Sequence, residues 1–135
     1  MCGIAGIYHF DGTPASPVTL KAMTDALVHR GPDGEGQFTD GPVALGHRRL
    51  SIIDLSDAAH QPMPSADGKL VLTYNGEVYN FQELRIDLEA KGHSFRSRGD
   101  SEVVVTAFRE WGLDAVSKFN GMFSLAVWDR ANRRL

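Results

Sequence analysis

The segment 122–128 restricts the fold of this chain most, because it is apolar on both faces of the strand that it predicts. A strand of this kind has to be covered by a further layer on each side. Strand patterns come early in the chain, helical patterns follow in the middle, and this strand comes late. That order predicts an α+β fold built from stacked layers.

Two further strands are predicted by short apolar or alternating runs. Residues 2–8 alternate between the two faces of a strand, and residues 70–74 form a second apolar strand. Asn75-Gly76 is a preferred pair for a two-residue hairpin turn, so we expect residues 77–79 to pair back onto 70–74. The glycine-rich segment 33–36 is expected to form a loop.

Three helices are expected between these strands. The first has Ser16 as its N-cap, with a proline at its first position. Its apolar stripe is expected to comprise Leu20, Met23 and Leu27. Apolar residues at helical spacing predict two further helices in 81–88 and 104–111, which glycines end.

The composition excludes several classes of protein. With 135 residues the chain is expected to form one domain, and 42% apolar with 23% charged residues describes a soluble globular protein. The net charge of −3 gives no electrostatic reason to expect nucleic acid or a membrane surface, and no apolar run approaches the roughly 20 residues of a membrane span. One cysteine cannot form an internal disulfide, and no spacing of ligands predicts a metal site.

The end of the sequence predicts an incomplete domain. A polar turn over 129–133 follows the late apolar strand directly, and residues 134–135 would begin its hairpin partner. We therefore expect residues 1–135 to be one domain that is truncated at its C-terminus.

Cys2 carries the strongest candidate chemistry, although a lone cysteine is more often a small buried residue. Removal of Met1 would give Cys2 a free α-amine beside its thiol. Free α-amines have a pKa of about 7.7–8.0, so this amine could act as the base for the nucleophile on the same residue.

Four other residues have both a structural and a functional interpretation. Asn75 and Gly76 are a hairpin turn, or donors to the oxyanion that forms when a thiolate attacks a carbonyl. Arg49 is a solvated arginine beside another arginine, or a clamp for an α-carboxylate. Asp100 is a helix N-cap, or the receiver of an α-ammonium group, which Glu77 could assist.

The chain as a whole resembles the class II glutamine amidotransferase domain at the front of glutamine-hydrolysing asparagine synthetases. The resemblance rests on seven motifs in register: Met-Cys-Gly-Ile-Ala-Gly at 1–6, His-Arg-Gly-Pro-Asp at 29–33, Gly-His-Arg-Arg-Leu-Ser-Ile-Ile-Asp at 46–54, His-Gln-Pro-Met at 60–63, Tyr-Asn-Gly-Glu-Val-Tyr-Asn at 74–80, Gly-Asp-Ser-Glu at 99–102 and Phe-Asn-Gly-Met-Phe at 119–123. Gly99 departs from the serine that relatives often carry before the aspartate.

The resemblance implies the fold of the N-terminal-nucleophile hydrolases, a four-layer αββα sandwich of antiparallel sheets. It also implies a role for each site residue. Cys2 is the nucleophile, and Asn75 and Gly76 form the oxyanion hole. The implied substrate-binding residues are Arg49 for the α-carboxylate, Asp100 for the α-ammonium group, and Glu77, Leu50, Ile52 and Ile53 along the site.

The activity implied is the glutaminase half of an asparagine synthetase, in which a Cys2 thioester releases ammonia from glutamine. The implied partner is a C-terminal synthetase domain of the same gene product, which uses ATP and magnesium to amidate aspartate. This chain itself is expected to need no cofactor, to be cytoplasmic, and to be compatible with a homodimer. The alternatives are another ammonia acceptor, such as a peptide or sugar carboxylate, and a non-catalytic module.

Overall fold

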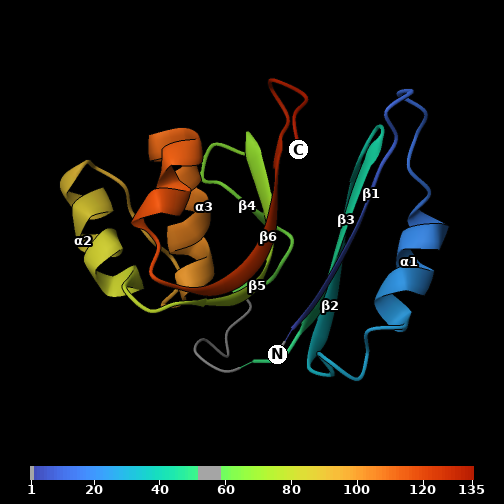
Figure 1. Ribbon diagram of the computed structural model, residues 1–135, viewed down its shortest axis with the longest axis horizontal. Coiled ribbons are helices and arrows are strands. Elements are labelled where there is room, and N and C mark those ends of the chain that lie inside the picture. The colour runs from blue at the N-terminus through green and yellow to red at the C-terminus, as the bar shows by residue number, and fades with distance from the viewer. Residues whose placement is uncertain (1, 52–58) are drawn as a thin grey trace.

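The computed structural model describes residues 2–51 and 59–135, and these form four layers. Figure 1 shows helix α1 on one side, two sheets in the middle, and helices α2 and α3 on the other side. Both sheets are antiparallel. The αββα sandwich expected for the family is therefore present.

The first sheet has the strand order β1-β3-β2, from β1 (Gly3–Tyr8), β3 (Val43–Arg49) and β2 (Gly34–Asp40). Helix α1 (Pro17–Asp25) covers its outer face. The Ser16 hydroxyl accepts a hydrogen bond from the amide of Thr19, so the predicted N-cap is confirmed.

The second sheet has the order β4-β5-β6, from β4 (Met63–Pro64), β5 (Leu70–Val78) and β6 (Gly121–Asp129). Helices α2 (Phe81–Ala90) and α3 (Asp100–Trp111) cover its outer face, and the 3-10 helix η2 (Gly112–Lys118) leads into β6. The largest apolar core lies between this sheet and the two helices, and a smaller core lies between the sheets.

Several local expectations were wrong. The expected glycine-rich loop is in fact the start of β2, since Gly34 pairs with Arg49 of β3 and Gly36 with His47. The expected apolar stripe of α1 is incomplete, because Leu20 is buried but Met23 is 37% exposed and Leu27 follows the end of the helix. Strand β6 is covered on both faces only toward its end, where Trp128 is fully buried; Met122 at its beginning is 67% exposed.

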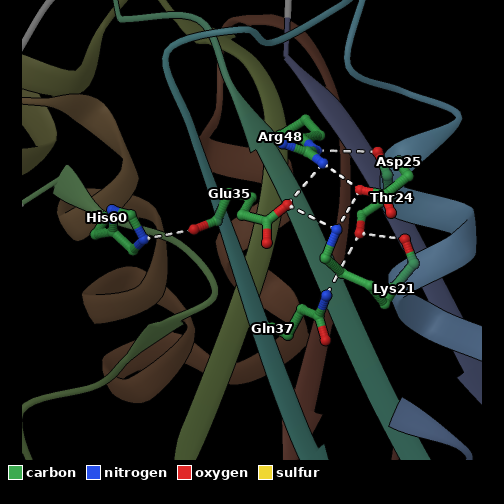
Figure 2. Close-up of polar contacts among 7 residues, drawn as sticks. All are labelled: Lys21, Thr24, Asp25, Glu35, Gln37, Arg48 and His60. Carbon is green, nitrogen blue, oxygen red and sulfur yellow. Dashed lines mark hydrogen bonds and ion pairs between the residues drawn. The ribbon is translucent and has the colours of Figure 1, made fainter. Parts of the chain in front are cut away.

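The outer face of the first sheet is joined to α1 by a polar cluster of Lys21, Asp25, Glu35 and Arg48 (Figure 2). The Arg48 guanidinium contacts Asp25 of α1 at 2.5 Å and Glu35 of β2 at 2.6 Å. Its Nε also donates to the backbone oxygen of Thr24. These contacts fix the helix on the sheet.

In the part of the chain that the structure describes, none of the helices is both long enough and apolar enough to cross a bilayer.

Candidate active site

A pocket of about 150 Å³ is lined by Cys2, by residues of both sheets and by the start of α3. It collects every predicted site residue that the structure describes: Cys2, Arg49, Leu50, Asn75, Gly76, Glu77 and Asp100. Ile52 and Ile53, which were predicted to line the site, lie outside the described residues, as does Met1. Residues far apart in the sequence therefore meet at one place.

Cys2 precedes β1 and is half-buried at the pocket wall. Its Sγ accepts a hydrogen bond from the amide of Leu50 at 3.4 Å and lies 3.7 Å from the carbonyl oxygen of the same residue, to which the thiol donates. The Nε of Arg30 donates to the Cys2 carbonyl oxygen at 3.0 Å. These contacts hold the thiol against the segment that follows β3.

The alternation of side chains along β3 decides which of its two arginines enters the site. Arg48 faces α1, where it forms the ion pairs of Figure 2. Arg49 lies on the opposite face, is 9% exposed and lines the pocket. By extension of the β1–β3 register, Arg49 stands opposite Cys2.

The Asn75-Gly76 pair is not a hairpin turn. Strand β5 runs through both residues without interruption, and they pair with Ser124 and Phe123 of β6. The glycine is required because a Cβ at this position would lie 2.4 Å from the Met122 oxygen and 2.5 Å from the Phe123 Cα. The close approach of the β6 backbone, and not the geometry of a turn, explains why residue 76 is a glycine.

The main chain of β5 directs the Gly76 amide away from β6. Tyr74 and Val78 use their amides on side-chain acceptors, Gln61 and Asp100, and not on β6. In an antiparallel strand, alternate residues direct their amides to the same edge. The Gly76 amide therefore points to this same edge, where Gly76 lines the pocket. It is suitably placed to donate to a developing oxyanion.

Asp100 is the first residue of α3, not its N-cap, a position that Gly99 occupies. Its Oδ2 accepts a hydrogen bond from the Tyr74 hydroxyl at 2.6 Å and another from the Val78 amide at 3.0 Å. Burial and the neighbouring Asp100 raise the pKa of the Tyr74 phenol, so this hydroxyl remains a donor. The contacts hold the carboxylate at the pocket with a fixed orientation.

His47 is fully buried between the sheets and also reaches the pocket wall. Its Nε2 lies 3.1 Å from the Tyr74 carbonyl oxygen, which can only accept, so this nitrogen carries the hydrogen. Burial lowers the pKa of His47 to about 4. The ring is therefore neutral near pH 7 and adds no charge to the site.

Sequence reasoning missed the supporting residues Arg30, His47, Gln61 and Tyr74. All four occur in motifs that carry the family resemblance, and that was the available signal. Their roles were not assigned because each acts through a contact between distant segments. Within residues 2–51 and 59–135, no group of three or more His, Cys, Asp or Glu side chains is placed to hold a metal ion.

The pocket brings the Cys2 thiol together with the Arg49 guanidinium and the Asp100 carboxylate. A thiol, a guanidinium and a carboxylate together suit a zwitterionic amino acid whose side chain reaches the sulfur. The backbone amide of Gly76 adds a donor of the kind that stabilises an oxyanion in acyl transfer.

Comparisons with known proteins identify relatives of the chain as a whole. The model of a family described as "Glutamine amidotransferase domain" matches residues 1–135. Asparagine synthetase [glutamine-hydrolyzing] 1 of Bacillus subtilis is 40% identical over 133 residues, which cover 96% of this chain and 21% of that protein. The Arabidopsis thaliana asparagine synthetase [glutamine-hydrolyzing] 1 is 38% identical over 130 residues, which cover 96% of this chain and 22% of that protein. The chain thus spans about a fifth of the length of these relatives.

A solved structure has the same fold. The glutamine phosphoribosylpyrophosphate amidotransferase of B. subtilis superposes with a TM-score of 0.78 at 21% identity. The superposition covers 96% of this chain and 35% of that chain.

Proposed function

Because the chain belongs to the glutamine amidotransferase domain family, we propose that its pocket hydrolyses glutamine to glutamate and ammonia. The observation that supports this most is the meeting of Cys2, Arg49 and Asp100 at a single pocket. The distance along the chain between these residues makes their meeting a property of the fold and not of local sequence.

In the proposed complex the two charged groups orient the substrate. Arg49 binds the α-carboxylate of glutamine and Asp100 its α-ammonium group, which leaves the side-chain amide directed at the Cys2 sulfur. Glu77, an exposed residue at the pocket edge, contributes negative charge to the mouth of the site.

The reaction proceeds in two steps at the Cys2 sulfur. The thiolate attacks the amide carbon, and the C–N bond breaks as ammonia leaves with the proton that the Cys2 α-amine took from the thiol. The Gly76 amide and the Asn75 side chain stabilise the oxyanion in the tetrahedral intermediate. Water then attacks the γ-glutamyl thioester, the C–S bond breaks, and glutamate is released.

We assign the use of ammonia to a further domain of the same gene product. The relatives named as glutamine-hydrolysing asparagine synthetases are about five times as long as the matched segment. We assign ATP and magnesium to that further domain as well, as the resemblance to the glutamine-hydrolysing asparagine synthetases implies. Aspartate is the acceptor we propose, and a cytoplasmic location follows from the need for a free thiol.

The proposal is tested by the intact mass of the full-length protein before and after treatment with 6-diazo-5-oxonorleucine, a reactive glutamine analogue. We expect a mass without Met1 and one adduct, which peptide mapping places on Cys2. The Cys2→Ala variant should gain no adduct and should release no glutamate from glutamine. Retention of Met1, or absence of the adduct in the unchanged protein, would favour the non-catalytic module.

A further inference from the structure

Gln61 is a buried side chain that the proposed reaction does not use, and it is 5% exposed. It lies between the segment that carries the oxyanion donor and the helix that carries Asp100. Both ends of its amide are engaged, because Oε1 accepts from the Tyr74 amide at 2.6 Å and Nε2 donates to the Ser101 hydroxyl at 3.3 Å.

The first of these contacts replaces a backbone contact of the sheet. Strand β4 pairs Met63 with Leu72, and an extension of this register would set residue 61 opposite Tyr74 and residue 59 opposite Gly76. The backbone does not continue in this way; the Gln61 side chain takes the hydrogen bond of Tyr74 instead. The ladder on this edge of β5 therefore stops before it reaches the Gly76 amide, which lines the pocket.

The second contact joins β5 to the start of α3. Ser101 follows Asp100 directly, and Asp100 in turn accepts from the Tyr74 hydroxyl at 2.6 Å. A closed ring of contacts thus runs from Tyr74 through Gln61 and Ser101 to Asp100 and back to Tyr74. The ring fixes Tyr74, two residues before the Gly76 amide on the same strand, relative to Asp100, which would hold the α-ammonium group of the substrate.

The backbone of Gln61 is itself held by the opposite sheet. A Cβ on Gly36 of β2 would lie 1.9 Å from the Gln61 carbonyl oxygen, so the absence of a side chain lets the two segments meet. The neighbouring His60 contacts the Glu35 carbonyl oxygen at 2.9 Å through Nε2 (Figure 2). Gln61 is therefore anchored from both sheets.

We propose that Gln61 is a positioning residue that keeps the Gly76 amide open to the pocket and in register with Asp100. This inference rests on the proposed glutaminase activity. Gln61 does not touch the reacting atoms; it acts through Tyr74 on one side and Ser101 on the other.

The test compares two reactions of Cys2 in the full-length protein. Hydrolysis of glutamine passes through an oxyanion, whereas alkylation of the thiol by iodoacetamide is a direct displacement that forms none. The Gln61→Met variant keeps a similar side-chain volume and removes both hydrogen bonds. We expect its kcat for glutamine hydrolysis to fall on the order of 100-fold, as misplacement of a catalytic donor does, and its alkylation rate to stay within about threefold of the unchanged protein.

Two further variants separate the effects of the two Gln61 hydrogen bonds, one to the Tyr74 amide and one to the Ser101 hydroxyl. Gln61→Glu keeps an acceptor for the Tyr74 amide and should recover part of the lost kcat. Ser101→Ala removes the hydrogen bond between Gln61 and the start of α3, next to Asp100. It should therefore raise the KM for glutamine more than it lowers kcat. Gln37→Met serves as the control, since Gln37 is an exposed residue of β2 whose side chain contacts Thr24 of α1, on the face of the sheet away from the pocket; we expect no change in either reaction.

The inference is wrong if Gln61→Met hydrolyses glutamine at the unchanged rate, or if alkylation and hydrolysis decline together. If Gln61→Met does not fold, an unchanged kcat and KM in both Gln61→Glu and Ser101→Ala would equally overturn it. Failure of the proposed function gives a different result, because the unchanged protein would then release no glutamate at all.

Discussion

Arg48 and Arg49 are adjacent in β3, yet they lie in different environments. The Arg48 side chain is 11% exposed and forms ion pairs with Asp25 and Glu35 on the face of the sheet that α1 covers (Figure 2). The Arg49 side chain faces the pocket together with Cys2. Their separation follows from the alternation of side chains in a strand. The same residue type thus fixes a helix at one position and is proposed to bind a carboxylate at the next.

This difference predicts unequal effects of the same substitution. In Arg49→Lys the planar fork that fits a carboxylate is lost, so the KM for glutamine should rise about 10- to 100-fold. Arg48→Lys is the matched control, with a KM and kcat close to those of the unchanged protein. Steady-state glutaminase kinetics measure both. Equal losses in the two variants would contradict the assignment of Arg49 to the carboxylate.

The neutral His47 makes stability depend on pH. The pKa of His47 is about 4 in the folded chain and about 6.5 for an unburied ring, so between these values the unfolded chain binds a proton that the folded chain excludes. The free energy of unfolding should therefore decrease as the pH falls through this window, by about 2 kcal/mol between pH 7 and pH 5. Urea unfolding at the two pH values measures this decrease.

The His47→Gln variant is the control for the pH effect. Glutamine has no group that titrates in this range, so the variant should lose this part of the pH dependence, whatever its stability at pH 7. An unchanged dependence on pH would show that other groups cause it.

The position of single residues at the site could be predicted from the sequence, whereas the contacts that support them could not. Cys2, directly after Met1, and Arg49, at the end of a strand, were predicted for the site by residue type and position, and both line the pocket. Gly76 was expected in a turn because Asn-Gly is common there, but the close backbone of β6 is what excludes a larger residue. Gln61 gave no local signal, since its partners Tyr74 and Ser101 are 13 and 40 residues away.

At the level of elements, β2 shows how glycines set the distance between layers. Gly34 and Gly36 were expected in a loop, but they belong to a strand that pairs with β3 along its length. Composition alone suggested a loop because glycine weakens strands. The pairing with β3 and the fit against Gln61 outweigh this preference.

The two glycines of β2 predict opposite tolerance of a methyl group. In Gly36→Ala the new Cβ would lie 1.9 Å from the Gln61 oxygen, so we expect a loss of about 1–3 kcal/mol in the free energy of unfolding. In Gly34→Ala the nearest atoms lie 3.8 Å away, so stability should stay the same or increase slightly. Thermal or urea unfolding distinguishes them. A Gly36→Ala variant as stable as Gly34→Ala would contradict the described contact between β2 and Gln61.

At the scale of the whole molecule, the two sheets are joined at the end of the sandwich away from the pocket. Trp128 of β6 is fully buried between the sheets, and its Nε1 donates to Asp40 of β2 at 3.0 Å. Arg130 and Arg133, which follow β6, pair with the same carboxylate. The hydrogen bond from Trp128 and the nearby arginines lower the pKa of Asp40. Apolar patterns predicted stacked α+β layers and the family resemblance implied the four-layer sandwich, but neither predicted this connection.

Trp128 should therefore matter more for stability than other large side chains. Trp128→Ala removes a buried ring and leaves a cavity between the sheets, so we expect a loss of about 3–5 kcal/mol in the free energy of unfolding. Leu113→Ala is the control, because Leu113 is 85% exposed and its truncation should change stability by less than about 0.5 kcal/mol. Similar losses in both variants would show that the sheets do not depend on Trp128.

The position of the site on strands has a consequence for how this chain can change in evolution. A single residue inserted in β3 before Arg48 would exchange the faces on which the two arginines lie, with no substitution at either position. An insertion in β5 before Tyr74 would likewise turn Asn75 toward the helices. The connection between β4 and β5 lies outside the pocket and has no such constraint. Insertions and deletions among descendants of this sequence are therefore expected to accumulate in that connection. In β3 and β5 only substitutions are expected.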